Sequence, residues 1–544
     1  MKRKYILTAF WTTCLRVSWA VGATFDVPSG NIQALREAIV KSNANQELNI
    51  INLEANGVYN FSNYFLEIKS REPEAGAVAL PPIQSNARLI INGNGATIKR
   101  DNSAAKFRFI VLGSRSEVVI NNTFFENGYS EYAGGAVVVG YQAALSVNAC
   151  KFINNYAGAA ALDYGGGAIY TKSLSKLSVA SSEFKANRAG NSGGAIHTFL
   201  SAVNIENSKF VENQCVSDKG KGGALFINGA NGDEGKVRLY NSLWVMNGAA
   251  MQGGAIVMLA YNQEKVLIDK CILSDNKVWA ENSTGGALWA NADELDIPLQ
   301  LFEKDKDRTR LDIQRCVFSN NTAVEAGGAI WLGDGHVQIE NSMISHNSVG
   351  RTDGTGGYGG GVYALSQSVK LQNSSVTNNY AGNSAGGVFS ASQAKVILGN
   401  TTVAYNIANT LVNKTENCGA IYTTKATASR TVKLSEKTVM PSCNDNLLVS
   451  PTWSGNNLQH SAKQQTVSYA LRDMDVILFE NITKIKTPRF RRLVAAIFAP
   501  ADTTVPQTTA SRYANKMEHA PASAWMHLSP AAQKQWLELM KSVK

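Results

Sequence analysis

The chain has 544 residues, seven cysteines and a formal net charge of +10. The charge is concentrated at the two ends: residues 1–23 carry four cations and no acid, and residues 484–544 carry ten cations against three acids. The long middle section is therefore close to neutral, which excludes a nucleic-acid partner for it, because such a surface needs a basic stripe. Length alone predicts several domains, but internal repeats predict one elongated domain instead.

Residues 1–23 read as a secretory signal peptide. A Lys-Arg-Lys start is followed by the apolar run Tyr5–Leu15, and Val21-Gly22-Ala23 suits cleavage before Thr24. The alternative is a segment buried in the core. The signal predicts a secreted protein or one held at the outer membrane or cell surface.

Residues 24–45 are predicted to cap the N-terminal end of the fold. Ile32, Leu35, Ala38 and Ile39 recur at the spacing of one helical face. We expect this face to cover the first turn of the next domain, where an open sheet edge would otherwise recruit other chains.

From residue 46 to about 430 the chain is organised by two alternating phrases. The first is a glycine pair followed by Ala and an aliphatic residue, as in Gly193-Gly194-Ala195-Ile196, and most copies lie 27 to 34 residues apart. The second is an aromatic or aliphatic residue followed three places later by Asn. Its asparagines are Asn127, Asn155, Asn187, Asn213, Asn247, Asn276, Asn321, Asn347, Asn379 and Asn406.

These repeats predict a right-handed parallel β-helix, an all-β solenoid. Each unit holds short alternating segments, such as Val203-Asn204-Ile205, that cannot bury an apolar face alone but can do so by stacking. We expect the glycines at a corner with positive φ or close backbone approach. The asparagines are expected to form an internal ladder in which amides bond to neighbouring turns.

The two phrases together resemble the repeats of the chlamydial polymorphic outer-membrane proteins, over Phe124 to Ile421. The resemblance implies a surface adhesin whose β-helix precedes a membrane-embedded autotransporter barrel. After the last repeat we expect no such barrel, because about 120 residues follow and they lack repeated amphipathic strands of about 10 residues.

The residue that directly follows the inward aliphatic residue of each glycine phrase is often aromatic. Strand alternation should turn this position outward, which gives a stripe at the spacing of the turns. We interpret it as a ligand-binding face, and the alternative is a self-stacked ladder that stabilises the rod. The predicted binding residues are Tyr170, His197, Phe226, Trp289, Trp331, Tyr363 and Tyr422, and Ser390 is expected to continue the stripe between the last two.

The cysteines predict two disulfides. Six remain after removal of the signal, an even number that suits an oxidising compartment. Cys271 and Cys316 fall in consecutive repeats, within reach of each other across one turn. Cys418 and Cys443 are expected to close the last turn. The alternative for the repeat cysteines is a buried stack of small side chains.

No catalytic residues, cofactor or metal site is predicted. The acids are scattered singly, without the paired carboxylates of glycoside hydrolysis, and the six histidines lack metal-ligand spacing. The leading hypothesis is an adhesin or a rod that binds a cell-surface glycan or protein ligand. The rivals are a polysaccharide lyase or hydrolase on the pectin-lyase-like fold, and a structural spacer.

Beyond the repeats, residues 431–483 are predicted to form a C-terminal cap and residues 484–544 a basic, partly disordered tail. The cluster Lys484–Arg492 precedes the apolar run Leu493–Ala499. We expect this tail to contact an anionic membrane peripherally, because the run is too short to span a bilayer.

Overall fold

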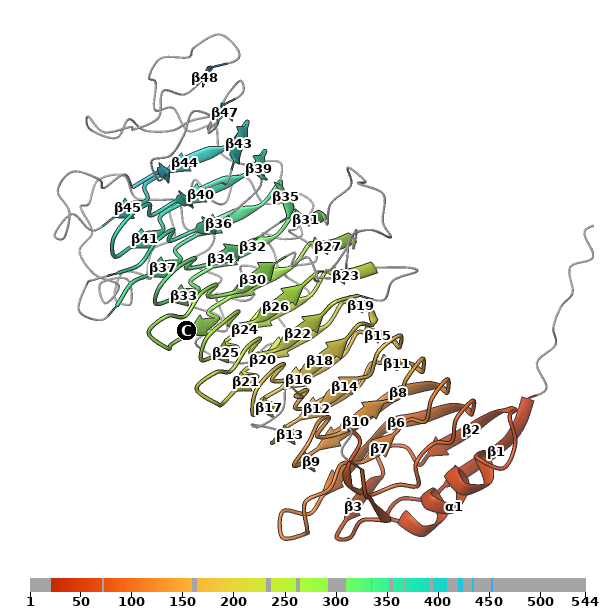
Figure 1. The fold of residues 1–544 in the computed structure, drawn as a ribbon. Helices are drawn as coiled ribbons and strands as arrows, with labels where there is room; N and C mark the ends of the chain where they lie inside the picture. Colours follow the sequence, from red (N-terminus) through yellow and green to blue (C-terminus); the bar gives the residue numbers. More distant parts are fainter. Residues whose placement is uncertain are drawn as a thin grey trace, which may run out of the picture.

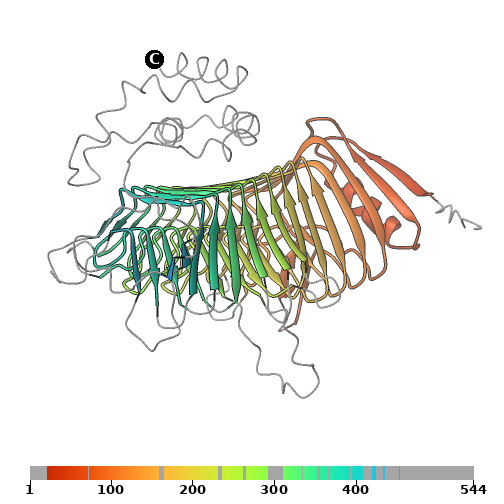
Figure 2. The ribbon, with the colours of Figure 1, turned by 90° about the horizontal axis from the view of Figure 1, so that it is seen from above.

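The computed structural model describes residues 21–70, 73–158, 164–230, 236–260, 265–291, 310–333, 335–351, 356–365, 368–391, 395–408, 419–423, 433–434 and 452–453. Over these ranges the chain winds into a parallel β-helix, as predicted (Figure 1). Figure 2 shows the strands of successive turns lying in parallel rows. Within the described part of the chain, no helix is long and apolar enough to cross a membrane.

The largest sheet, sheet A, has 25 strands, which lie in two columns side by side. From β11 onward a short bend in the chain separates the strand in the long column from the next strand, which lies in the short column. The long column holds β1 (Val21–Val27), β2 (Leu48–Leu53), β6 (Arg88–Arg100), β8 (Glu117–Glu126), β11 (Ala144–Asn148), β15 (Lys176–Ala180), β19 (Ala202–Glu206), β23 (Lys236–Tyr240), β27 (Lys265–Asp269), β31 (Arg310–Gln314), β35 (His336–Glu340), β39 (Ser368–Gln372), β43 (Lys395–Gly399), β47 (Lys433–Leu434) and β48 (Thr452–Trp453). The short column holds β3 (Val58–Phe61), β12 (Lys151–Ile153), β16 (Glu183–Lys185), β20 (Lys209–Val211), β24 (Leu243–Val245), β28 (Ile272–Ser274), β32 (Val317–Ser319), β36 (Met343–Ser345), β40 (Ser375–Thr377) and β44 (Thr402–Ala404).

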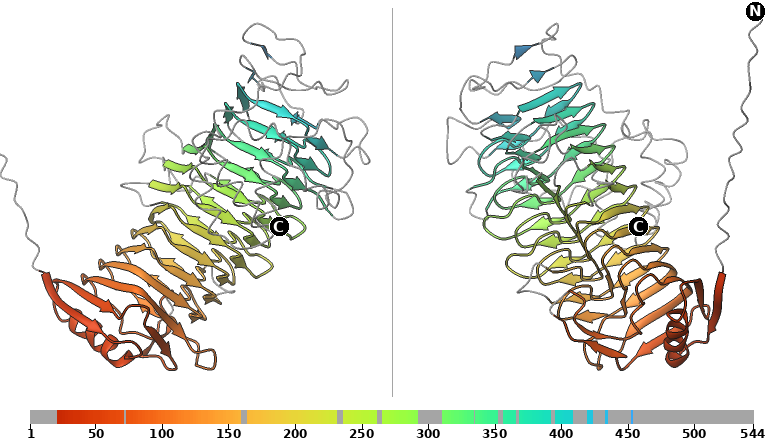
Figure 3. Two further views of the ribbon diagram at one scale, coloured as in Figure 1. Left: turned by 180° about the vertical axis from the view of Figure 1, so that it is seen from behind. Right: turned by 45° about the vertical axis from the view of Figure 1, so that its right-hand side comes forward.

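Two further parallel sheets close the rod, and Figure 3 shows the strands of the rod from two more sides. Sheet B follows the glycine pairs and holds β7 (Ile110–Val111), β10 (Val137–Val139), β14 (Ile169–Thr171), β18 (Ile196–Phe199), β22 (Leu225–Asn228), β26 (Ile256–Leu259), β30 (Leu288–Asn291), β34 (Ile330–Leu332), β38 (Val362–Ala364), β42 (Val388–Ser390) and β46 (Ile421–Thr423). Sheet C precedes them and holds β9 (Tyr129–Ser130), β13 (Tyr156–Ala157), β17 (Arg188–Ala189), β21 (Gln214–Cys215), β25 (Gly248–Ala249), β29 (Lys277–Val278), β33 (Thr322–Ala323), β37 (Ser348–Val349), β41 (Tyr380–Ala381) and β45 (Ile407–Ala408). The antiparallel hairpin β4 (Leu66–Ile68) and β5 (Gly76–Val78) lies outside these sheets.

The N-terminal end is capped by α1 (Ile32–Ser42), as the helical spacing predicted. Asn31 begins the helix, and its side chain accepts a 2.9 Å hydrogen bond from the Ala34 N–H. Leu35, Ala38 and Ile39 are buried. Strand β1 precedes this helix and already pairs with β2, so the rod begins earlier than residue 46. The pairing is regular from Thr24, the residue predicted to follow signal cleavage; residues 1–20 lie outside the described part.

The glycine pairs form the corner between sheets C and B, and each glycine is required for a different reason. Gly193 has a φ of +59°, where L side chains are strained. At Gly194 a Cβ atom would lie 2.0 Å from the Gly223 carbonyl oxygen and 2.6 Å from the Gln214 nitrogen. The second glycine is therefore fixed by close backbone approach on two sides.

Nine of the ten asparagines predicted to stack form one continuous ladder inside the rod. The backbone N–H and the Nδ2 of Asn187 both donate to Asn213 Oδ1 at 3.0 Å, and Asn187 Nδ2 also donates to the Phe152 carbonyl oxygen at 2.9 Å. The same three bonds recur from turn to turn, so every polar atom of these amides is used. The members are Asn155, Asn187, Asn213, Asn247, Asn276, Asn321, Asn347, Asn379 and Asn406.

Asn127 does not belong to this ladder. Phe125, not Phe124, pairs in register with Phe152, so the phrase is displaced by one residue in β8. The backbone N–H of Gly128 consequently donates to Asn155 Oδ1 at 2.9 Å. Asn127 occupies the preceding turn position with a φ of +62°, which asparagine tolerates better than most residues.

The expected Cys271–Cys316 disulfide is not formed, because both thiols are free and buried. Each thiol instead donates to backbone carbonyl oxygens, as the serines at the same position of other turns do: Cys271 Sγ lies 3.5 Å from the Leu239 oxygen and Cys316 Sγ 3.4 Å from the Ile268 oxygen. Burial raises the pKa of Cys316 well above its ordinary value. The expected Cys418–Cys443 pair, the C-terminal cap and the tail lie outside the described residues.

Candidate functional site

The predicted aromatic stripe lies along the outward positions of sheet B. The strand register aligns the members of the stripe from one turn to the next. The prediction is wrong by one residue in β42, where Phe389 and not Ser390 pairs with both Tyr363 and Tyr422. Over its central turns the column reads Tyr170, His197, Phe226, Val257, Trp289, Trp331, Tyr363 and Phe389. Tyr422 continues it in β46, where only the backbone is described.

Most rings of this column are buried by their neighbours rather than exposed. Tyr170 is 3% exposed, His197 1%, and Phe226 and Trp289 7% each, while Trp331 and Tyr363 are half-buried. The column is covered because it lies beside the corner between sheets C and B. Ser192 of that corner contacts His197, with Oγ 2.7 Å from Nδ1.

From Trp289 to Phe389 the rings pack face to face along the rod axis, whereas the planes of Tyr170 and His197 are tilted by 56° and those of His197 and Phe226 by 53°. Trp289 and Trp331 have centroids 4.6 Å apart and planes 2° apart, and Tyr363 and Phe389 lie 5.1 Å apart with planes at 4°. A sugar ring stacks on an aromatic face, and these faces are already occupied by other rings. The expectation of an exposed stripe therefore fails at its first four members, and the stacked ladder describes the geometry better.

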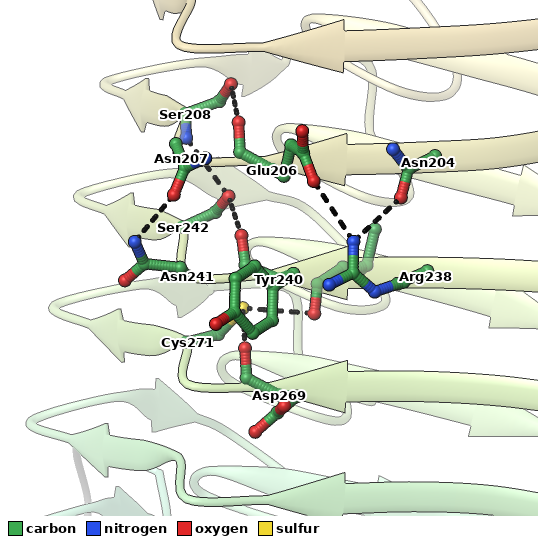
Figure 4. Close-up of polar contacts among 11 residues, drawn as sticks. Asn204, Glu206, Asn207, Ser208, Arg238, Tyr240, Asn241, Ser242, Asp269 and Cys271 are labelled. Carbon is green, nitrogen blue, oxygen red and sulfur yellow. Dashed lines mark hydrogen bonds and ion pairs between the residues drawn. The ribbon is translucent and has the colours of Figure 1, made fainter. Parts of the chain in front are cut away.

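A second candidate site lies on the outer face of sheet A, in the long column (Figure 4). Glu206, Tyr240 and Asp269 occupy paired register positions on β19, β23 and β27. Arg238 Nη1 donates to Glu206 Oε2 at 3.1 Å and to Asn204 Oδ1 at 3.2 Å. Its guanidinium carbon also lies 4.3 Å from the centre of the Tyr240 ring. This geometry holds the guanidinium over the ring.

The carboxylate at the end of β27 is neutralised by the next turn. Arg315 Nε donates to Asp269 Oδ1 at 2.8 Å and Arg315 Nη2 to Oδ2 at 2.5 Å, which is a bidentate pair. The carboxylate is 7% exposed and the guanidinium 33% exposed. Lys270, between them in sequence, has its ammonium 5.8 Å from the Tyr240 ring centre.

Two exposed lysines extend this positive region along the same sheet face. Lys236 and Lys265 occupy paired register positions on β23 and β27, about 4.8 Å apart. Among the described residues neither contacts a carboxylate. Like charges in register on neighbouring strands repel each other, so this placement costs stability. The positive region, hereafter the basic cluster, consists of Lys236, Arg238, Lys265, Lys270 and Arg315.

Sequence reasoning missed the basic cluster. In the sequence the acids are scattered singly, because the cations that pair with Asp269 and Glu206 come from other turns. The usable signal was the position of each residue within its repeat: Lys236 and Lys265 both open the long strand of their turn. Over the residues that the structure describes, no group of three His, Cys, Asp or Glu side chains is arranged to hold a metal ion.

Comparison with known families supports the repeat assignment. The model of the Chlamydia polymorphic membrane protein repeat matches residues 149–172 and 315–333. Each match contains one asparagine of the ladder and one glycine pair of the corner. Both matched stretches lie in the part of the chain that winds into the rod.

No curated protein matches this chain. Among solved structures, a periplasmic alginate epimerase, AlgG, is similar to it with a TM-score of 0.35 and 10% sequence identity. The similarity covers 68% of this chain and 84% of the epimerase.

Proposed function

We propose that this protein is a rod displayed at the cell surface that binds an acidic polysaccharide along the outer face of sheet A. The observation that carries the proposal is the pair Lys236 and Lys265, which contacts no carboxylate among the described residues and is set in register beside Arg238 and Lys270 on a rod that is otherwise close to neutral. Repulsion between these lysines is relieved when an anion lies over them. The repeat family is named for a membrane protein, which supports display at the cell envelope.

A linear polymer suits this geometry better than a compact anion. Positions on one sheet column repeat about every 4.8 Å along the rod, close to the length of one sugar unit, so successive acidic groups can meet successive turns. The register column continues from Lys265 to Arg310 and then His336. Tyr240, between two cations, offers a hydroxyl group to a sugar.

The aromatic column is a weaker candidate for this contact, because its ring faces are used in stacking. Trp331 and Tyr363 remain half-buried, and their polar ring edges are the parts that a ligand can reach. A ligand at this column would bind through hydrogen bonds to ring edges, and it would not need a negative charge.

One observation favours the rival function of polysaccharide cleavage. A lyase needs a base beside cations that stabilise a developing negative charge, and Arg238 lies against Tyr240. The nearby carboxylate of Asp269, however, is held by two bonds from Arg315. The cluster therefore offers charge complementarity without a free carboxylate base, which supports binding over cleavage.

The test compares the full-length protein with the double variant Lys236→Ser/Lys265→Ser on immobilised polyuronate, sulfated polysaccharide and neutral dextran. We expect binding to the acidic polymers only, weakened by salt, and reduced at least about tenfold in the variant. Lys219→Ser/Lys277→Ser, which removes the same charge from exposed positions elsewhere on the rod, is the matched control and should bind normally.

Equal losses in the two double variants would show that net charge, not the basic cluster, drives binding. If the protein binds dextran and Trp331→Ala abolishes this binding, the ligand-binding site lies at the aromatic column and not at the basic cluster. Release of unsaturated or shortened sugars from the acidic polymers, abolished by Tyr240→Phe, would establish the enzyme instead.

A further inference from the structure

An exposed indole, that of Trp279, lies on the outward side of sheet C. The strands of this sheet follow one another along one side of the rod, from β9 to β45 (Figure 1). Val278, the last residue of β29, points inward and is 3% exposed. Strand alternation therefore turns its two neighbours, Lys277 and Trp279, outward. Trp279 is 42% exposed, so part of its ring is open to a ligand.

The indole covers a position where the neighbouring strand has no side chain. Gly248 of β25 pairs in register with Lys277, and a Cβ atom at Gly248 would lie 2.9 Å from Trp279 Cζ3. The φ of Gly248 lies outside the left-handed region, so its backbone does not require glycine. The other described strands of sheet C have a side chain at this position: Tyr129, Tyr156, Arg188, Gln214, Lys277, Thr322, Ser348, Tyr380 and Ile407. The side chain missing at Gly248 therefore makes room for the indole, which rests on the sheet.

The charged groups beside this indole balance one another. The Lys277 ammonium lies 6.0 Å from the centre of the indole, at the outer limit of a cation–π contact. Glu281 follows Trp279 by two residues, and its Oε1 lies 3.2 Å from Arg351 Nη1. The other nitrogen, Arg351 Nη2, lies 3.6 Å from Glu325 Oε2. Two cations and two carboxylates leave this part of the surface close to neutral, in contrast to the basic cluster.

An indole with such a charged border suits a sugar better than a protein partner. The centre of a protein interface is depleted of lysine and glutamate, which here lie beside the ring. An aromatic face packs against the C–H groups of a sugar ring, and this contact needs no charge on the sugar. The Glu281 side chain is 72% exposed and can accept hydrogen bonds from hydroxyl groups, while that of Arg351 is 35% exposed and can donate them.

The order of these groups along the rod favours an extended polymer. The Trp279 ring reaches over Gly248 of the turn before its own, and Arg351 follows β37, which lies two turns after β29. Three turns at about 4.8 Å span roughly 14 Å, close to the length of three sugar units in an extended chain. A β-1,4-linked chain of glucose units is extended in this way, whereas an α-1,4-linked chain is curved.

We propose that Trp279 is a stacking platform for a neutral, extended β-1,4-linked glycan, and that Glu281 and Arg351 bind hydroxyl groups of the same chain. This site is independent of the basic cluster, because it lies on sheet C and its ligand carries no charge. Binding at Trp279 therefore does not depend on salt, whereas binding of an acidic polymer to the basic cluster does. The rod then holds two separate sites for two chemical classes of glycan.

The test measures the binding of cellohexaose and maltohexaose to the full-length protein by isothermal titration calorimetry, at low and at high salt. Both probes are neutral chains of glucose, but cellohexaose is β-1,4-linked and maltohexaose α-1,4-linked. Trp279→Ala removes the platform, and Gly248→Ala keeps the indole but displaces it with a Cβ atom 2.9 Å from Cζ3. Tyr380→Ala is the matched control, because it removes a ring that is 39% exposed on the same sheet.

We expect the parent to bind cellohexaose in preference to maltohexaose, with the same Kd at both salt concentrations. Trp279→Ala should raise this Kd at least about tenfold and Gly248→Ala by a smaller factor, while Tyr380→Ala and Lys236→Ser/Lys265→Ser should bind like the parent. The proposal is overturned if the parent does not bind cellohexaose, if Trp279→Ala leaves the Kd unchanged, or if Tyr380→Ala loses as much affinity. Equal binding of the two probes overturns it as well, because the site then does not select an extended chain.

Discussion

Asn213 Oδ1 accepts two hydrogen bonds from Asn187, one from its backbone N–H and one from its Nδ2, each at 3.0 Å. Replacing Asn213 by Leu leaves both donors without an acceptor inside the rod, and it leaves the Phe184 carbonyl oxygen without its donor at 2.9 Å. Each buried orphan costs about 1–3 kcal/mol, so we expect Asn213→Leu to lower the free energy of unfolding by about 3–5 kcal/mol.

A matched control for this variant exists on the outside of the rod. Asn148 Nδ2 donates to Asn121 Oδ1 at 3.0 Å in a second amide ladder on the outer face of sheet A, where water can replace the lost bond. Asn148→Leu should therefore cost less than about 1 kcal/mol. Denaturant melts followed by far-UV circular dichroism compare the two; equal losses would show that burial is not what makes the inner ladder stabilising.

The glycine corner gives the second prediction. Gly194→Ala forces a Cβ atom against the backbone of two other segments, and backbone cannot move aside as a side chain can. We expect a loss of about 2–4 kcal/mol, or failure to fold. Gly158→Ala is the control, because its Cβ would meet the Tyr156 side chain at 3.1 Å and the ring can shift. A Gly194→Ala protein with parental stability would contradict the assignment of this glycine to close approach.

The repeats made most of the fold predictable from sequence. The ladder and the glycine corner follow from phrases whose physical requirements are strict, a buried amide in one case and an absent Cβ in the other. The displacement at Asn127 was not predictable by the same route, because Phe124 and Phe125 fit the aromatic position equally well and only strand pairing distinguishes them.

The candidate sites were harder to predict. Alternation correctly turned Trp289 away from the main core, but alternation says nothing about what covers an outward residue, and the neighbouring corner and stacked rings bury it. The basic cluster depends on which residues meet across turns. Arg315 meets Asp269 although they are 46 residues apart in the sequence, because β27 and β31 are neighbours in the sheet. Such contacts become visible only when the register is known.

Trp289 and Trp331 give the third prediction. Their rings stack at 4.6 Å, but Trp289 is 7% exposed and also packs against Val257, whereas Trp331 is half-buried. Trp289→Ala should cost about 3–5 kcal/mol and Trp331→Ala about 1–3 kcal/mol. Chemical denaturation of both variants measures the difference. If Trp289→Ala has the same free energy of unfolding as the parent, the aromatic column does not stabilise the rod. The interpretation of the column as a ligand-binding stripe would then be favoured again.

His197 gives the last prediction, on pH. Burial lowers its pKa to about 3, against an ordinary value of about 6.5 for an unfolded chain. Above about pH 6.5 the imidazole is neutral in both states and has no effect on stability. Between the two pKa values the unfolded state binds a proton that the folded state excludes, so the free energy of unfolding falls as pH decreases. Below about pH 3 both states are protonated and the loss is complete.

The contribution of His197 can be isolated by comparing pH dependences. At 1.36 kcal/mol per unit, lowering the pH from 7.5 to 5.0 should cost the parent about 2 kcal/mol through this residue alone. His197→Gln removes the titrating group and keeps a polar side chain beside Ser192, so its stability should change less over this range by about that amount. His336→Gln, on the exposed face of β35, is the control and should follow the parent. Parallel curves for the parent and His197→Gln would mean that the buried ring takes up its proton in the folded rod.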